Sequence, residues 1–249
     1  MYKKIISFIV ALIFLYLLFY FIPIYKGNSK AIFNNYQKLW VHRVLDSNDA
    51  NTKFINFKGI EIDVFFEIEK KVFDVRHHGK YRGNTLLDFL SNIHDKELFL
   101  WIDLKNLNNR NVLAIRNRLI EIIDSGVNKE HLLIESKNIE LLGVLQNEGF
   151  YVSYWLPTFN FIKSTYEVFQ VKNDLIKYKP NAISCSYHNV DFYSRKFPKY
   201  NLHCWTTNYG PRGQSMGLEE GEDNLKVLKI SLRDNVKVIL VDFKNNFIQ

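Results

Sequence analysis

Two carboxylates stand two residues apart in the apolar segment GIEIDVFF, residues 59–66. Side chains at i and i+2 of a β-strand lie on the same face, so Glu61 and Asp63 would share one side with Cα atoms about 6–7 Å apart. Like charges held that close in a buried site resist joint ionisation unless a cation lies between them. The pair therefore predicts a cation site on a strand.

A third carboxylate follows in the apolar run ELFLWIDLK. Asp103 in this run would come from an adjacent strand and converge with Glu61 and Asp63, which gives three oxygen donors. Oxygen ligands suit Mg²⁺ or Ca²⁺, whereas a zinc site would normally contain more histidine or cysteine. The three acids predict a Mg²⁺ or Ca²⁺ site.

Basic side chains and histidines flank these acids in the sequence. Arg43 and Lys105 would lie beside the metal ion, and a cation next to basic groups is a place for a phosphate. Cleavage of a phosphodiester also needs a base and an acid, and histidine serves as both near neutral pH. His42 ends the first strand candidate, and His77 or His78 lies just beyond the second.

Eight short apolar runs could be the strands that position these groups, and helical patterns separate most of them. Strands that alternate with helices at this spacing indicate parallel β-α-β units, and eight units favour a (β/α)₈ TIM barrel. An open doubly wound sheet is the alternative, but no glycine-rich phosphate loop follows the first strand. The strand candidates are 39–44, 59–66, 97–105, 131–137, 151–157, 182–188, 201–207 and 236–243, and the helical patterns are 84–93, 111–124, 138–149 and 161–178.

Polar groups gather at the C-terminal ends of these strand candidates. In a TIM barrel all these ends face one rim, where such enzymes keep their active sites. An extra extended segment at 70–78 is expected to be a return strand or an active-site loop, and Glu67 and Glu69 before it are expected to be solvated. The strand-end groups are His42, Arg43, Asp103, Lys105, Glu135, Lys137, His188, Trp205, Thr206, Thr207, Asn208 and Asp242.

The order of these residues resembles the glycerophosphodiester phosphodiesterase family, a group of TIM barrels in the superfamily of phosphatidylinositol-specific phospholipase C-like phosphodiesterases. The likeness covers nearly everything from residue 39 to residue 243. It is carried by HR at 42–43, EID at 61–63, a histidine at 77, IDLK at 102–105, WTTN at 205–208 and VD at 241–242.

The resemblance implies a metal-dependent hydrolase. Two departures from the family pattern bear on the site: HH at 77–78 stands for the usual H-D, which leaves open which histidine acts, and Asp103 stands for the usual Glu of an E-x-K pair. The shorter Asp103 could shift the metal. By this resemblance the metal ligands are Glu61, Asp63 and Asp103, the acid/base pair is His42 and His77, the phosphate-facing groups are Arg43 and Lys105, and the substrate-side tryptophan is Trp205.

The N-terminal segment 5–25 contains no charged residue and would span about 31 Å as a helix, which matches the hydrocarbon thickness of a bilayer. We interpret residues 1–25 as a single-pass transmembrane signal anchor, residues 26–37 as a linker and residues 38–249 as the barrel. A cleaved signal peptide is the alternative, although its apolar region is usually shorter. An N-terminal anchor favours a barrel at the membrane on the extracytoplasmic side.

The net charge of +7 fits ordinary surface lysines, and the sequence contains neither a nucleic-acid motif nor a dense basic run. The leading hypothesis is a metal-dependent hydrolase of a glycerophosphodiester or a related lipid or envelope phosphodiester. A second hypothesis is a non-catalytic barrel, similar to the menorin-like branch of the superfamily, that binds an anionic lipid headgroup or a glycan. A glycoside hydrolase is a third, but it needs one carboxyl kept protonated, which the flanking cations oppose.

Overall fold

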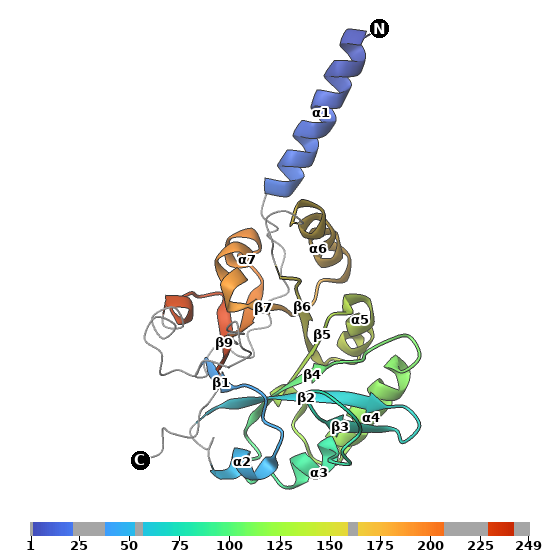
Figure 1. The fold of residues 1–249 in the computed structure, drawn as a ribbon, viewed down its shortest axis with the longest axis vertical. Coiled ribbons are helices and arrows are strands. Elements are labelled where there is room, and N and C mark those ends of the chain that lie inside the picture. Colours follow the sequence, from blue (N-terminus) through green and yellow to red (C-terminus); the bar gives the residue numbers. More distant parts are fainter. Residues whose placement is uncertain (1, 22–37, 53–56, 159–163, 207–228, 242–249) are drawn as a thin grey trace.

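The computed structural model describes residues 2–21, 38–52, 57–158, 164–206 and 229–241. Within these ranges, eight parallel strands form a closed ring, because β1 pairs with β9 on one side and with β2 on the other (Figure 1). The predicted TIM barrel is confirmed. Its strands are β1 (Leu39–Val41), β2 (Gly59–Glu67), β4 (Phe99–Leu104), β5 (Leu132–Ser136), β6 (Tyr151–Trp155), β7 (Ala182–Ser186), β8 (Asn201–Trp205) and β9 (Val236–Val241).

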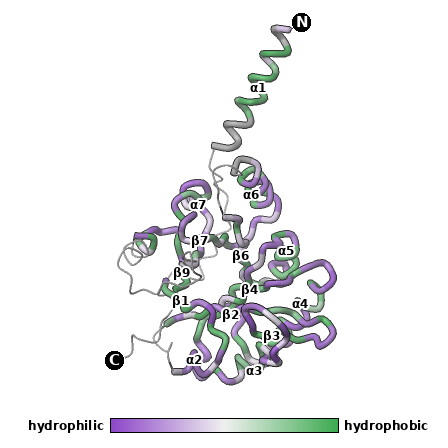
Figure 2. The backbone as a smooth tube through the Cα atoms, viewed as in Figure 1, coloured by the Kyte–Doolittle hydropathy of each residue, from purple (hydrophilic) through white to green (hydrophobic). Residues whose placement is uncertain are grey.

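Helices cover the outside of the ring, with hydrophobic residues toward the strands and hydrophilic ones toward solvent (Figure 2). In α4, for example, Val112, Ile115, Leu119 and Ile122 recur at helical spacing and are buried, as expected for one apolar face. Four helices match the predicted patterns: α3 (Leu86–Ser91), α4 (Val112–Asp124), α5 (Ile139–Asn147) and α6 (Ser164–Tyr178). The sequence did not predict α2 (Ser47–Thr52), α7 (Val190–Lys196) or the 3₁₀ turns η1 (Lys129–His131) and η2 (Tyr187–Asn189).

Alternation along each strand divides the residues between two cores. In β4, Leu100, Ile102 and Leu104 pack outward against the helices, whereas Phe99 and Trp101 point into the barrel. The inward set fills the interior below the C-terminal rim with large side chains, which makes a packed floor. The same alternation carries the carboxylates inward, one step above the floor. The interior cluster consists of Trp40, Phe99, Trp101, Leu133, Tyr151, Ala182, Val238 and Leu240.

A glycine at the start of β2 makes room for one of these floor residues. A Cβ atom on Gly59 would lie 2.3 Å from the Trp40 ring. Gly59→Ala is therefore expected to lower the free energy of unfolding by about 1–3 kcal/mol, the usual cost of overpacking. Gly143→Ala is the control, because no atom lies within 4 Å of its added Cβ in α5. In urea unfolding, the free energy of unfolding should fall for Gly59→Ala and rise slightly for Gly143→Ala, because alanine favours a helix. Equal losses of stability in the two variants would contradict this packing.

The additional strand β3 (Val72–Val75) runs antiparallel to β2, with Val64 opposite Val75. It lies outside the ring of eight and turns the chain back toward the C-terminal rim (Figure 1). The extended segment predicted at 70–78 is thus confirmed as a return strand. Its end delivers His77 and His78 to the rim.

The N-terminal helix α1 (Tyr2–Phe21) projects away from the barrel (Figure 1). Among the residues that the structure describes, none of the helices combines the length and the hydropathy needed to cross a membrane. The transmembrane anchor predicted over residues 1–25 is therefore not supported by the described residues. Residues 22–25 and the predicted linker at 26–37 lie outside the described ranges.

Candidate metal and phosphate site

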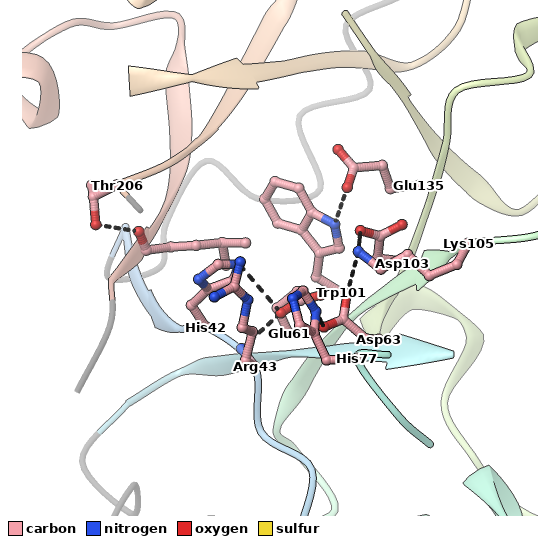
Figure 3. Close-up of polar contacts among 11 residues, drawn as sticks. His42, Arg43, Glu61, Asp63, His77, Trp101, Asp103, Lys105, Glu135 and Thr206 are labelled. Carbon is pink, nitrogen blue, oxygen red and sulfur yellow. Dashed lines mark hydrogen bonds and ion pairs between the residues drawn. The ribbon is translucent and has the colours of Figure 1, made fainter. Parts of the chain in front are cut away.

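Three carboxylates meet at the C-terminal rim of β2 and β4. Glu61 and Asp63 point inward from β2, and the parallel register places Asp103 of β4 directly beside Asp63. One oxygen of each acid lies within 4.8 Å of the others, and each residue is at most 5% exposed. Figure 3 shows the three acids facing a common space. The structure thus brings together the three residues predicted as metal ligands.

A lysine neutralises part of this charge. The Lys105 ammonium contacts both Asp63 and Asp103. Burial alone would lower the pKa of Lys105, but the nearby carboxylates Asp103, Asp63 and Glu61 raise it above its ordinary value. For Asp63 burial acts in the opposite direction and would raise the pKa. The contact with His77 and the charge of Lys105 outweigh burial, so the pKa of Asp63 is lowered overall. Asp63 and Lys105 are therefore the charged pair at the centre of the site.

The other two acids are held toward their protonated form. Burial, followed by repulsion from Asp63 and Asp103, raises the pKa of Glu61 well above its ordinary value. Burial also raises the pKa of Asp103 to about 6, although Lys105 opposes the shift. Burial thus disfavours a negative charge on either acid, and the neighbouring carboxylates add repulsion.

The chemistry of this donor set fits a divalent cation. Glu61, Asp63 and Asp103 offer only oxygen ligands, which Mg²⁺ and Ca²⁺ prefer. Asp103 Oδ1 is buried and has no hydrogen-bond partner among the described residues, and a buried acceptor without a partner is costly. A cation bound by these oxygens would satisfy that atom and relieve the repulsion.

The residues that follow β1 contact the Glu61 carboxylate. His42 Nε2 lies 3.8 Å from Glu61 Oε2, and the Arg43 backbone N–H donates a 2.7 Å hydrogen bond to the same oxygen. Arg43 has φ of 58°, a left-handed conformation that is uncommon outside glycine. The Val44 N–H bonds to the Glu61 carbonyl at 2.9 Å, which holds the turn on the other side. The turn therefore places His42 and the Arg43 backbone N–H beside Glu61, and both residues line the cavity at the barrel mouth.

Of the two adjacent histidines, His77 contacts the acids. Its Nδ1 pairs with Asp63 Oδ2, and the side chain is 22% exposed. The His78 ring lies against the His77 ring with centroids 3.8 Å apart, and His78 is exposed. The geometry thus favours His77 in the choice that the sequence left open.

The loop that carries His77 is anchored by a buried carboxylate that sequence reasoning did not single out. Asp74 accepts hydrogen bonds from the backbone N–H groups of Arg82 and Gly83, each at 3.0 Å, and from the Arg76 guanidinium at 2.7 Å. Arg76 also pairs with Glu67 at 2.6 Å. The prediction that Glu67 is only solvated surface was wrong, because strand pairing brings Arg76 back beside it.

Asp74→Asn is expected to reduce turnover about tenfold to hundredfold, since a shift of about 1 Å at a reacting group can cost that much. The effect should fall on kcat more than on KM, because Asp74 positions His77 and lies outside the cavity. The free energy of unfolding should drop by about 2 kcal/mol, as for a lost charged hydrogen bond. Glu69→Gln on the same hairpin is the control. An unchanged kcat in Asp74→Asn would contradict the positioning role.

One cavity of about 190 Å³ at the mouth of the barrel is lined by most of the site residues, but not by Asp63 or Lys105. Trp205, at the end of β8, forms part of its wall, as predicted for a substrate-side residue. Trp155 of β6 packs edge-on against Trp205, with ring centroids 5.2 Å apart. The cavity contains His42, Arg43, Glu61, His77, His78, Asp103, Glu135, Trp155, Trp205 and Leu240.

Glu135 and Trp155 also line the cavity, and the sequence interpretation gave neither of them a role. Glu135 lies beside Asp103 in the register of β4 and β5, and accepts hydrogen bonds from the Trp101 Nε1 at 3.0 Å and from the Ser184 hydroxyl. Burial, and then the charge of Asp103, raises its pKa well above the ordinary value. The signal available in the sequence was the position of Glu135 and Trp155 at strand ends, which places both residues at the rim of the barrel.

Some strand-end groups lie elsewhere. His188 is exposed in η2 and lines a different hollow beside Asp191 and Lys229. Thr206 donates a 2.9 Å hydrogen bond to the Leu240 carbonyl, which is a structural role. Thr207, Asn208 and Asp242 lie outside the described residues.

No family model and no curated protein matches the sequence. Among solved structures, the chain resembles a protein assigned as a glycerophosphodiester phosphodiesterase from Galdieria sulphuraria, at 15% identity and a TM-score of 0.56 over 82% of this chain and 92% of that one. The chain also resembles a phosphodiesterase from Oleispira antarctica that was solved with its product sn-glycerol-3-phosphate. The identity is 12% and the TM-score is 0.56, over 84% of this chain and 94% of that one.

The glycerol uptake operon antiterminator regulatory protein of Listeria monocytogenes also matches, at 9% identity and a TM-score of 0.50 over 91% of this chain and 98% of that one. At these identities a likeness shows the fold alone, and proteins with different functions share it. Two of these three proteins are phosphodiesterases by name, the group whose residue order the sequence resembles. The chain has the closed TIM-barrel fold found in glycerophosphodiester phosphodiesterases.

Proposed function

We propose that this protein is a divalent-metal-dependent hydrolase of a glycerophosphodiester or a related lipid or envelope phosphodiester. The observation that carries the proposal is the convergence of three carboxylate oxygens within 4.8 Å, beside a cavity that His42 and His77 line. The likeness to a phosphodiesterase solved with sn-glycerol-3-phosphate supports a small phosphate ester as the ligand.

Glu61, Asp63 and Asp103 would hold Mg²⁺ or Ca²⁺, which when bound polarises a phosphoryl oxygen as a Lewis acid. His77 is oriented through Nδ1 by Asp63, so its Nε2 is the atom that exchanges a proton with the substrate. His42 lies across the cavity beside Glu61. One histidine removes a proton from the attacking hydroxyl or water, and the other protonates the leaving alcohol as the phosphorus–oxygen bond breaks.

Basic and aromatic side chains would position the phosphodiester. Arg43 lines the cavity, and Lys105 contacts the acids next to it, so both can balance the phosphate charge. Trp205 would close the side of the cavity where the alcohol group lies, which limits the access of water to the reacting centre.

A second candidate function is binding of an anionic lipid headgroup or a glycan without turnover. The specific observation in its favour is the Lys105 ammonium, which already contacts two of the three acids. A lysine in that place compensates the carboxylates without a metal, and the same fold also occurs in a regulatory protein.

Turnover by the full chain separates the two candidates. Glycerophosphodiesters and bis-p-nitrophenyl phosphate should be hydrolysed with Mg²⁺ or Ca²⁺ and not with EDTA. Glu61→Ala should abolish the reaction, whereas Glu69→Ala, an exposed change on the same hairpin, should leave it unchanged. Binding of sn-glycerol-3-phosphate without any metal-dependent turnover would favour the second candidate.

The placement of the barrel outside the cytoplasm rests on the N-terminal sequence alone. If it holds, protease added to intact cells should cleave the barrel. Protection that ends only when the cells are lysed would contradict the placement.

A further inference from the structure

A second, larger hollow of about 600 Å³ opens beside the metal site, where β4, β5 and β6 end. It shares His78 and Trp155 with the cavity of the site. Lys105 also lines it, and its ammonium contacts Asp63 and Asp103. A phosphodiester held at the acids could therefore extend one of its alcohol groups into this groove.

One wall of the groove is an aromatic ring with two lysines near it. The Lys137 ammonium lies 4.0 Å from the centre of the Trp155 ring, and the Lys105 ammonium lies 5.3 Å from the same centre. Among the described residues, Lys137 makes this ring contact and no hydrogen bond or ion pair. A quaternary ammonium group would normally bind such a ring face, but here it would meet two positive charges.

The remaining lining offers both donors and acceptors of hydrogen bonds. Lys137 can only donate, the Asp174 carboxylate accepts, and Asn138 can do both. Tyr154 donates a 3.4 Å hydrogen bond to Asp174, which keeps that carboxylate at the edge of the groove. A second phosphate group would be repelled by Asp174 and by Glu140, which also line the groove. Hydroxyl groups both donate and accept, so they fit this mixed lining.

We propose that the groove binds the alcohol moiety of the substrate and selects an uncharged polyol or sugar over a quaternary ammonium alcohol. The Trp155 ring gives the carbon skeleton an apolar surface, while Lys137 and Asp174 hydrogen-bond the hydroxyl groups. This inference rests on the proposed phosphodiesterase function and names the class of alcohol on that side of the phosphate.

A comparison of substrates by the full chain tests the proposal. The ratio of kcat/KM for glycerophosphoinositol to that for glycerophosphocholine is expected to be about tenfold or more, which corresponds to about 1.4 kcal/mol. Lys137→Gln should narrow the ratio and Lys137→Glu should bring it to about one or below, because the added carboxylate attracts the ammonium. Lys58→Gln, an exposed change outside the groove, is the control and should leave the ratio unchanged.

If the ratio of kcat/KM for the two substrates is the same in the wild-type chain and in Lys137→Glu, the proposal for the groove is overturned. The phosphodiesterase function would remain intact. If no phosphodiester is cleaved, including bis-p-nitrophenyl phosphate, the proposed function fails, and calorimetric binding of the same two ligands then decides the groove separately. Tighter binding of glycerophosphoinositol that Lys137→Glu weakens would support the groove. Equal affinities of the two ligands would overturn it.

Discussion

His42→Ala and His77→Ala are each expected to lower kcat for an alkyl phosphodiester by about 10²–10⁴-fold, the usual contribution of a general acid or base. The reason is geometric, because both histidines line the cavity in which the three acids converge. The double variant should be little worse than either single one, since groups that act as a unit are not additive. Steady-state kinetics of the full chain measures all three.

Two exposed histidines provide matched controls, because His94→Ala and His188→Ala remove the same ring outside the site. The leaving group then separates the two roles. A variant that lacks the general acid should be far less impaired on bis-p-nitrophenyl phosphate, whose leaving group needs no proton, than on a glycerophosphodiester. A kcat for either cavity variant that stays within about threefold of wild type would contradict acid/base catalysis by these residues.

Asp103→Asn is expected to abolish metal-dependent turnover and, in the metal-free protein, to raise the free energy of unfolding by about 3 kcal/mol at pH 7. Burial raises the pKa of Asp103 to about 6 from an ordinary value of 3.8. The unfolded chain therefore loses this proton at lower pH than the folded protein does. Stability from this group is complete below about pH 4 and is lost as the pH rises through about 6. The amide of Asn keeps an acceptor for Lys105 and carries no charge, so the variant does not lose stability as the pH rises through about 6.

Unfolding at pH 5 and pH 7, with EDTA or with Mg²⁺ or Ca²⁺, tests this account. A metal ion requires ionised carboxylates, so it should stabilise the wild-type protein more at pH 7 than at pH 5 and should leave Asp103→Asn unaffected. Asp88→Asn, a change at an exposed carboxylate of α3, is the control. Equal stabilisation by metal of the wild-type protein and Asp103→Asn would rule Asp103 out as a ligand.

The sequence predicts the barrel well because its strands and long helices carry strong periodic patterns. Glu61, Asp63 and Asp103 could be placed together because inward positions alternate along neighbouring parallel strands. Short helices such as α2 and α7 contain too few turns for a clear apolar face. Their existence depends on the surrounding barrel rather than on local pattern.

Contacts between distant segments could not be predicted from the sequence. Glu67 joins Arg76 only because β3 folds back on β2. Glu135 lies beside Asp103 through the register of β5 against β4, and Trp155 lines the same cavity. Their positions at strand ends place them at the rim, but spacing along the chain does not give them a role there. His77 could not be separated from His78 by type, because the choice depends on which ring the hairpin turns toward Asp63.

Metal occupancy measured together with turnover shows whether the three acids hold a metal ion that phosphodiester hydrolysis requires. The metal-free full chain would be titrated with Mg²⁺ or Ca²⁺ by calorimetry, and hydrolysis of a glycerophosphodiester would be measured on the same samples. Activity is expected to rise in proportion to bound metal, and Asp63→Asn is expected to lose both metal binding and activity. Hydrolysis that persists unchanged in EDTA, or a fully occupied site that hydrolyses no phosphodiester, would contradict it.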